Sequence, residues 1–515
     1  MKKSSYIFIF LCFIPLLIWR DFTPNNELKY LSIADEAIRN GHFFTFWNHN
    51  TIYADKPPLY FWIIMLGKWL FGDHYMLFLG LFSLIPALVI VKIMDTWVKP
   101  TLLPAYLNSA GITLMTTGLF VGSAIVLRMD MLMCMFITLA LYTFYKIYSG
   151  IYTKKDPLKL PVFIFLAVFS KGPVGLLVPL ISIVSFLIIK KQISKINRYL
   201  GWKQWSIFLG LCIIWFTAVY SEGGKSYLYN LLFHQTIHRA VDAFDHKAPW
   251  WYYLKTISYM LAPWTLFYLL IIITGVKKQL INTDLKKFFL TIIAITFVTL
   301  SAFSAKLDIY LLPIYPFTTY LTFILLPELN KKFINISIAI PALILTLVLP
   351  CIWIVSSYTP VPIPQNTIFF ITTLILTSFS IYTLYNLWQK RLIRAMNSLS
   401  TGILLTILIG SLAISGLNQY LGLRKICQKA ATIACENGIE NYYYFQFRSG
   451  ENIDVYLKQE IHKIDIPHLN SLLDKQKFIL FVKNKDKIRQ EYREEQPYLV
   501  SREFWNKYLE IEKYQ

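Results

Sequence analysis

Residues 75–93 read YMLFLGLFSLIPALVIVKI, a run of nineteen residues whose one charged side chain, Lys92, stands next to the end. A helix rises about 1.5 Å per residue, so a helix of this length covers most of the roughly 30 Å hydrocarbon core of a bilayer. Because a charged side chain in that core is costly, a run with so little charge predicts a transmembrane helix.

The composition of the whole chain agrees with this interpretation. Of the 515 residues, 56% are hydrophobic and 15% are charged, whereas a soluble protein has about 25% charged residues. The net charge of +21 arises from 50 Lys and Arg against 29 Asp and Glu. In a soluble protein such an excess suggests nucleic acid as a partner, but in a membrane protein its meaning depends on where the charges lie.

Similar apolar runs recur along the chain. The first, residues 6–19, resembles a signal peptide but lacks a small-x-small cleavage site, so we expect an uncleaved span. Residues 58–71 are interrupted by Gly67 and Lys68 and predict a helix that lies in the membrane interface. The other predicted spans are 75–93, 104–126, 130–148, 159–170, 173–189, 204–220, 255–275, 288–304, 309–327, 333–356, 367–388 and 398–416. We therefore predict an all-α polytopic membrane protein with about 13 transmembrane helices.

The basic residues test this count independently. If the N-terminus is cytoplasmic, the inside loops hold 22 basic and 4 acidic residues, and the outside loops hold 12 and 11. This asymmetry is what the positive-inside rule demands, and a wrong count would have scrambled it partway along the chain. We expect the N-terminus inside, with a large first outer loop (20–74) and another outer loop at 221–254.

The chain changes character after residue 417. Residues 418–515 contain 16 basic and 14 acidic residues and no apolar span. Strand-like runs at Tyr442–Phe447 and Phe478–Val482 alternate with amphipathic helical runs at Ile453–Glu460 and Lys485–Glu494, which predicts a small α/β domain. An odd number of spans places this domain outside the cytoplasm. We thus divide the chain into a transmembrane domain (1–417) and an extracytoplasmic domain (418–515).

The polar residues that could take part in catalysis or ligand binding lie on the predicted outer side, at span ends or in outer loops. They include Glu27, Asp55, Lys56, Arg128, Asp130, Lys171, His234, His238 and Lys306. Ionisable groups at span ends are costly unless they pair or function. Cations suit a lipid phosphate, and carboxylates can act as a base or hold a metal. This pattern predicts transfer of a group from a lipid phosphate. Neither GxGxxG nor a P-loop occurs, so we expect no nucleotide cofactor.

Five segments carry a resemblance to a known family. They are PNNELKYLSIADEAIRNGHFFTFWNHNTIYADKPPLYFW (24–62), RMDMLM (128–133), SKGPVG (170–175), HKAPWWYYL (246–254) and AKLDIYLLPIYP (305–316). In order and position they resemble the aminoarabinose transferase-like glycosyltransferases, which are related to protein O-mannosyltransferases and share the GT-C-type fold. Members of this family take a sugar from a polyprenyl phosphate.

The resemblance and the charge pattern together imply roles for eight residues. Asp130 and Glu27 are the expected catalytic residues. Lys56, Arg128, Lys171 and Lys306 are expected to bind the donor phosphate, and Asp55 and His234 are expected to bind a metal, with His238 as a competitor for the histidine position. The chain departs from the family at Asn26, where the family has Asp. Asn26 cannot take a proton, so Glu27 or Asp130 would have to serve as base, or no base is needed.

We therefore predict an integral-membrane glycosyltransferase of the cytoplasmic (inner) membrane. It would move a hexosyl or pentosyl group from an undecaprenyl-phosphate donor to a lipid, glycan or protein acceptor of the cell envelope. A divalent metal (Zn, Mg or Mn) is the cofactor that the resemblance admits; we expect a monomer surrounded by membrane lipids, without a nucleic-acid partner. The alternative is a secondary transporter or a flippase of lipid-linked sugars. Transporters usually contain internal repeats, and none is found here, which favours the enzyme.

Overall fold

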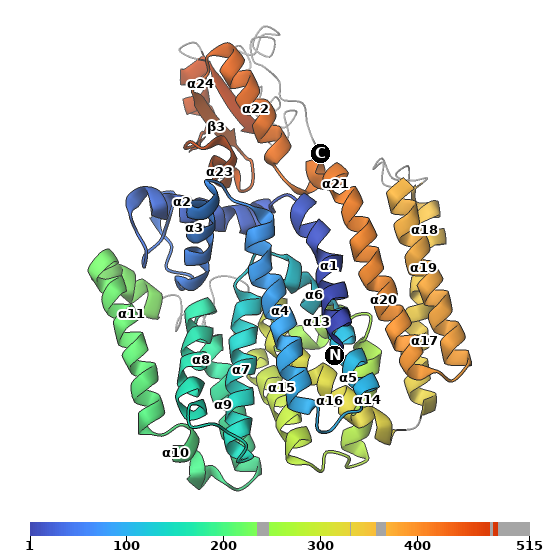
Figure 1. Ribbon diagram of the computed structural model, residues 1–515. Coiled ribbons are helices and arrows are strands. Elements are labelled where there is room, and N and C mark those ends of the chain that lie inside the picture. The colour runs from blue at the N-terminus through green and yellow to red at the C-terminus, as the bar shows by residue number, and fades with distance from the viewer. Residues whose placement is uncertain (234–246, 330, 357–366, 474–476, 483–515) are drawn as a thin grey trace. The chain divides into compact units, whose positions relative to one another are not determined.

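The computed structural model describes residues 1–515 except 234–246, 330, 357–366, 474–476 and 483–515 (Figure 1). The chain forms two compact units. Unit 1 contains Met1–Trp19, Ala54–Ile63 and Leu77–Ala413, and unit 2 contains Arg20–Tyr53, Ile64–Met76 and Ile414–Gln515. The first predicted outer loop thus groups largely with the C-terminal residues, although the two lie almost 400 positions apart in the sequence. Helix α3 (Leu59–Phe71) is divided between the units.

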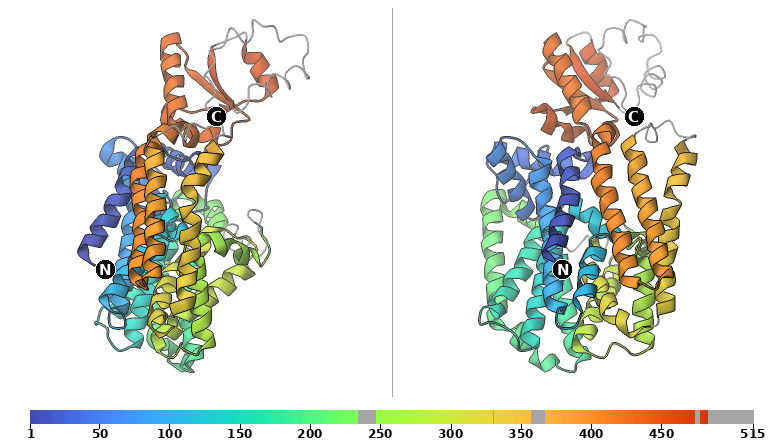
Figure 2. Two further views of the ribbon diagram at one scale, coloured as in Figure 1. Left: turned by 90° about the vertical axis from the view of Figure 1, so that its right-hand side faces the viewer. Right: turned by 45° about the vertical axis from the view of Figure 1, so that its right-hand side comes forward.

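Unit 1 is built from helices, and Figure 2 shows its long helices running side by side. The α-helices are α1 (Lys3–Trp19), α4 (Met76–Val98), α5 (Pro104–Leu114), α6 (Gly118–Ile125), α7 (Asp130–Tyr148), α8 (Asp156–Lys171), α9 (Val174–Ile189), α10 (Ile196–Tyr199), α11 (Trp202–Tyr229), α13 (Tyr252–Met260), α14 (Thr265–Lys277), α15 (Asp284–Ala302), α16 (Tyr315–Leu325), α17 (Lys331–Thr346), α18 (Val348–Ser356), α19 (Thr367–Trp388) and α20 (Leu392–Gly410). Short 3-10 helices are η2 (Ile193–Lys195), η4 (Asp308–Ile314), η5 (Leu326–Glu328) and η7 (Ser411–Ala413). Each of the thirteen predicted spans falls on one of these helices or on a consecutive group of them.

The lengths of the helices differ from the predicted ones. Among the described residues, eight helices are long and apolar enough to cross a membrane, or up to ten if each of two bent pairs forms one span. Two further apolar helices, Leu59–Phe71 and Val174–Ile189, are shorter. The polytopic helical fold is confirmed, and the count of 13 spans stays a prediction.

Two predicted spans are not continuous helices. The segment 255–275 is bent by 118° between α13 and α14, where Pro263 lacks the N–H that a helix needs. The segment 104–126 is interrupted between α5 and α6, and the N–H of Gly118 at that break donates to the carbonyl of Ala262 at 2.7 Å. The two breaks therefore satisfy each other, which explains how irregular backbone can persist among apolar helices.

An aromatic cluster ties four helices of unit 1 together. The ring of Trp97 on α4 lies 5.1 Å from Tyr142 and 5.5 Å from Tyr145, both on α7. It also lies 5.0 Å from Phe289 on α15 and 6.0 Å from Phe317 on α16. Aromatic pairs at such distances add about 0.5–1.5 kcal/mol each beyond their buried area.

Ion pairs join the loops that we predict to face the cytoplasm. They are Lys146–Asp156 at 2.6 Å, Lys190–Asp284 at 2.7 Å and Lys286–Glu328 at 2.6 Å. Lys146 and Asp156 flank a single loop, whereas the other two pairs join loops that follow different helices and therefore bring these loops together at one end of the helical bundle. This agrees with the predicted alternation of inside and outside loops.

Helices α8 and α9 form a hairpin, and the SKGPVG segment (170–175) is the turn that connects them. Gly172 closes α8 with a φ of 97°, which L side chains rarely adopt. A Cβ atom on Gly175 would stand 2.3 Å from the backbone carbon of Ala167, so glycine is needed for the close approach of the two helices. The turn thereby fixes Lys171, the last residue of α8.

Unit 2 contains a three-stranded parallel sheet with strand order β4-β3-β5. The strands are β3 (Asn441–Phe445), β4 (His462–Lys463) and β5 (Phe478–Val482), and the helices are α21 (Ile414–Leu421), α22 (Arg424–Asn437), η8 (Gly450–Ile453), α23 (Asp454–Leu457) and α24 (Ile466–Leu473). The first loop adds a π-helix, η1 (Pro24–Leu28), helix α2 (Lys29–Asn40) and a small hairpin of β1 (Trp47–Asn48) and β2 (Thr51–Ile52). The predicted strands match β3 and β5, while the predicted helix at 485–494 lies outside the described residues.

The two parts of unit 2 meet at a buried carboxylate. Asp454 is 4% exposed and accepts a hydrogen bond of 2.8 Å from the Ser32 hydroxyl on α2. Burial raises the pKa of Asp454 to about 6; His49 and the Ser32 hydrogen bond oppose the shift, and Asp35 adds to it. The ionised form is therefore the costly one in the folded state.

We expect Gly175→Ala to destabilise unit 1, because the added methyl group meets the backbone of α8. Overpacking of this kind costs about 1–3 kcal/mol. Thermal unfolding in detergent should give a lower Tm for this variant. Gly210→Ala on α11 is the matched control, because a Cβ there meets nothing within 4 Å. An unchanged Tm for Gly175→Ala would contradict the close approach.

We expect the stability of unit 2 to fall as the pH rises through about 6. A carboxyl with a raised pKa holds its proton more tightly in the folded state, so its contribution is present below the ordinary pKa and lost above the raised one. The full effect is on the order of 2–3 kcal/mol. Melting curves between pH 4 and pH 7.5 should show less dependence on pH for Asp454→Asn. The exposed Asp465→Asn is the control, and equal pH dependence in all three chains would contradict the assignment.

Candidate functional site

The site begins with the carboxylate that opens α7. Asp130 is 1% exposed and is the first residue of that helix, where the helix dipole favours a negative charge. Its Oδ2 accepts a hydrogen bond of 3.0 Å from Nε of Arg128, and its Oδ1 accepts one from the Lys171 ammonium. Two cations from different segments therefore neutralise one buried carboxylate, as a charge in so apolar a setting requires.

Lys171 connects this pair to the rest of the site. Its side chain is 6% exposed, and Nζ lies 4.9 Å from the ring centroid of Tyr310, within the range of a cation–π contact. The ammonium also interacts electrostatically with Arg128, Lys56 and Asp55. Tyr310 was missed as a site residue, although it stands inside the AKLDIYLLPIYP segment that carried part of the resemblance.

Asp55 and Lys56 form the third part of the site. Nζ of Lys56 lies 2.6 Å from Oδ2 of Asp55, and both side chains are largely buried, at 15% and 19% exposed respectively. The pair precedes Pro57 and Pro58 at the start of α3, where two prolines limit the backbone to few conformations. The turn therefore holds both charges in a restricted position.

These five charged residues, with Tyr310, are the cation cluster: Asp55, Lys56, Arg128, Asp130 and Lys171. Three cations and two carboxylates leave a net charge of +1. A cluster of this composition is stable without a ligand because each carboxylate has a partner. It can also accept a phosphate, since Lys binds phosphate as a point charge and Arg as a bidentate fork.

Lys306 has a different environment from the one we predicted. It is 4% exposed, and its ammonium donates to the carbonyl of Ala248 at 2.9 Å and to that of Phe303. Burial lowers the pKa of Lys306. Next to it, Lys247 and Ala305 form a β-bridge. The hydrogen bonds from Lys306 to Ala248 and Phe303 hold two loops together. Neither bond joins Lys306 to the cation cluster.

Asp308, two residues after Lys306, also connects two segments of the chain. Its Oδ1 accepts a hydrogen bond of 2.7 Å from the Tyr252 hydroxyl, and its Oδ2 accepts one of 2.6 Å from the Tyr259 hydroxyl. Both tyrosines belong to α13. The HKAPWWYYL and AKLDIYLLPIYP segments, which lie about 50 residues apart, are thus held side by side by backbone and side-chain bonds.

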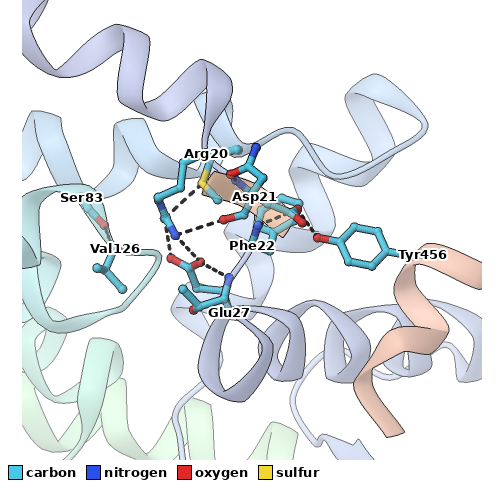
Figure 3. Close-up of polar contacts among 10 residues, drawn as sticks. Arg20, Asp21, Phe22, Glu27, Ser83, Val126 and Tyr456 are labelled. Carbon is cyan, nitrogen blue, oxygen red and sulfur yellow. Dashed lines mark hydrogen bonds and ion pairs between the residues drawn. The ribbon is translucent and has the colours of Figure 1, made fainter. Parts of the chain in front are cut away.

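Glu27 belongs to unit 2 and is fully buried at 0% exposed. The Arg20 guanidinium donates two hydrogen bonds to it, at 2.7 and 2.8 Å, and the N–H of Thr23 donates a third at 2.7 Å (Figure 3). Both carboxylate oxygens of Glu27 therefore accept hydrogen bonds from its own loop. These contacts indicate a structural role for the residue that we predicted as catalytic.

The described residues do not fit a metal ion. No group of three or more His, Cys, Asp or Glu side chains among them could hold one. Asp55 is paired with Lys56, and the predicted partners His234 and His238 lie outside the described residues. The donor set that the structure describes is therefore one carboxylate with a cation beside it, which is no cation site.

Comparison with known proteins bears on the fold and on the family. No family model matches the chain. An undecaprenyl phosphate-alpha-4-amino-4-deoxy-L-arabinose arabinosyl transferase of Wigglesworthia glossinidia brevipalpis is 27% identical, over 59% of this chain and 55% of that protein. A transferase of the same name, numbered 2, from Pseudomonas fluorescens is 23% identical over 46% of this chain and 41% of its own length. The chain thus spans about half the length of the curated relatives it matches.

A solved structure matches over nearly the whole chain. ArnT from Cupriavidus metallidurans, in a crystal structure bound to undecaprenyl phosphate, is 14% identical and superposes with a TM-score of 0.76, over 96% of this chain and 94% of that one. Its apo state gives a TM-score of 0.71. The chain has the ArnT fold. The resemblance drawn from five sequence segments and the multi-span fold class are both confirmed.

We expect Arg20→Met and Glu27→Gln to act mainly on the stability of the folded protein. Removing one partner of a buried ion pair costs about 3–5 kcal/mol. Both variants should therefore melt at lower temperature, while the folded fraction should keep a KM for the lipid-phosphate donor within about threefold of wild type. Arg39→Met is the control, because this arginine is exposed on α2.

A different result would restore Glu27 as a catalytic residue. If Glu27→Gln melts like wild type but loses activity by more than about 100-fold, the carboxylate acts on the reaction and the structural assignment is wrong.

Proposed function

We propose that this protein is an integral-membrane glycosyltransferase that takes a sugar from a polyprenyl-phosphate donor. The observation that carries the proposal is the cation cluster, in which Lys56, Arg128 and Lys171 gather around Asp55 and Asp130 in a chain with the ArnT fold. The crystal structure of ArnT from Cupriavidus metallidurans contains undecaprenyl phosphate, which supports the same class of donor for this protein. The names of the curated relatives also support it.

The cations of the cluster would bind the donor phosphate and stabilise it as it leaves. In the transfer, the bond between the anomeric carbon and the phosphate oxygen breaks, and the phosphate keeps the electron pair. An acceptor oxygen forms the new bond from the opposite face of the sugar. Charge on the phosphate rises at this moment, so cations already in place lower the barrier without reorganisation.

Asp130 would orient Lys171 and Arg128 toward the phosphate. Its two oxygens each accept a hydrogen bond from one of these cations, which suits it to positioning them. If the acceptor is itself a phosphate, no proton has to leave it; a hydroxyl acceptor would release its proton to water as the new bond forms. Lys306 would act by holding the outer loops, and the mechanism has no step through a metal.

The acceptor would be a lipid, glycan or protein at the outer face of the inner membrane. Charge asymmetry of the loops favours a cytoplasmic N-terminus and an extracytoplasmic C-terminal domain. The names of the relatives and of the similar solved structures give no support to the rival function, a transporter or flippase.

We expect Lys171→Met and Asp130→Asn to lower kcat/KM by about 100-fold or more, because each removes a charge from the cluster. Lys56→Met and Arg128→Met should lower it by about 10- to 100-fold. Lys255→Met on the exposed face of α13 is the control. The assay measures transfer of labelled sugar from undecaprenyl-phosphate-linked aminoarabinose, and from the corresponding hexose donors, to envelope lipids of a strain that lacks the protein.

Three outcomes of this assay would contradict parts of the proposal. Full activity of both Lys171→Met and Asp130→Asn would contradict the site. Movement of donor across the membrane without a new glycosidic bond would favour the flippase. Loss of transfer on adding a chelator, and its recovery with a divalent ion, would show that a metal takes part after all.

A further inference from the structure

Residues 21–32 are held at three places by the C-terminal residues of unit 2. The first place is Asp21, which is 5% exposed. Its carboxylate accepts hydrogen bonds from the Tyr456 hydroxyl and from the backbone N–H of Arg424, the latter at 3.0 Å (Figure 3). Its own N–H donates to Asn418 at 3.0 Å. One residue of the first loop thus binds three separate parts of the C-terminal segment, two through its side chain and one through its backbone N–H.

The packing around Asp21 leaves no spare space. A Cβ atom on Gly422 would stand 2.0 Å from Oδ2 of Asp21, so only glycine allows the backbone to come this close. The Arg424 guanidinium lies 5.9 Å from the centroid of the Phe22 ring and 5.3 Å from that of Tyr456. Cation–π contacts of this kind add to the hydrogen bonds.

The second and third places lie further along the same segment. The Ser449 hydroxyl donates to Oδ1 of Asn25 at 2.7 Å, and the Asn452 amide donates to the carbonyl of Pro24 at 3.4 Å. The Ser32 hydroxyl then donates to Asp454 at 2.8 Å. The contacts therefore flank the π-helix η1 on both sides, and two of them reach into it.

The π-helix that they hold has an uncommon geometry. Helices with the i to i+5 pattern are rare and are often found at functional sites. In η1 the side chain of Glu27 points inward to Arg20 and is fully buried, while the neighbouring Asn26 is exposed. An exposed amide that both donates and accepts hydrogen bonds suits a hydroxyl or phosphoryl group of an acceptor.

We propose that the C-terminal segment, residues 414–473 and 477–482, is a brace that sets the π-helix for the transfer reaction, and that Asp21, Tyr456 and Arg424 are positioning residues acting through it. The inference rests on the proposed glycosyltransferase function and deepens it. The exposed Asn26 amide on the braced π-helix is the group that would contact the acceptor. Loss of the brace should weaken use of the acceptor and spare the donor.

The first experiment adds a single methyl group against Asp21. Gly422→Ala is compared with Gly416→Ala, which lies on α21 and meets nothing within 4 Å. Tyr456→Phe, which removes the hydroxyl that Asp21 accepts, is compared with Tyr444→Phe on β3. The readouts are the apparent KM for envelope lipid extracted from a deletion strain, the KM for the undecaprenyl-phosphate sugar, and binding of undecaprenyl phosphate alone.

The expected result is a rise of at least tenfold in the KM for envelope lipid with Gly422→Ala and Tyr456→Phe. The KM for the donor and the binding of undecaprenyl phosphate should stay within twofold, as should every value for the two controls. An equal loss for donor and acceptor, or no loss at all, would overturn the brace. Absence of any sugar transfer by the wild-type protein would overturn the proposed function itself, and this inference with it.

A cross-link tests whether the braced arrangement is the active one. Asn25→Cys and Ser449→Cys are introduced into the full chain after the exposed Cys351 and Cys435 are replaced by Ser. The two thiols are joined by oxidation or by a short bifunctional reagent. A linked enzyme that keeps at least half of the wild-type activity supports the brace. Less than a tenth of that activity, or failure of both reagents to link the pair, would overturn it.

Discussion

The Asp130 carboxylate between Lys171 and Arg128 is the interaction on which the candidate site depends. An isolated charge at the end of an apolar helix is costly, so a carboxylate there must be paired. The partners come from the segment before α7 and from the end of α8, and the pairing therefore also fixes where these segments meet. The same cations are the groups that a lipid phosphate would need. Stability and the proposed chemistry thus use one set of charges.

A related constraint governs the backbone of unit 1. Without water, every N–H and carbonyl must find a partner inside the chain. The breaks at Gly118 and Ala262 satisfy one another, and Lys306 supplies an ammonium to two loop carbonyls. Irregular segments can therefore exist among apolar helices only where they meet another irregular segment or a charged side chain. Lys306 and its partner Ala248 lie in two of the segments that carried the family resemblance.

Much of the fold could be predicted from the sequence, because hydropathy and charge are local properties. Every predicted span is helical, and β5 has the predicted bounds. Asp130, Lys171 and Arg128 were chosen at span ends and Asp55 and Lys56 in the first outer loop, and these five residues do gather. The partners of Glu27 and Lys306 could not be predicted in the same way. Arg20 and a backbone carbonyl are unremarkable in the sequence, and only folding brings them within hydrogen-bonding distance.

The sequence by itself determined that this protein is a helical membrane protein, and it predicted which loops share a side and which charged residues stand at the ends of spans. These features follow from the cost of placing charge in a bilayer, and that cost acts on each segment separately. Only the tertiary structure decided which charges pair, which helices are broken, and that the first loop joins the C-terminal segment at Asp21 and Ser32. Such contacts join residues about 400 positions apart. They depend on shape and on competing partners, which no local pattern records.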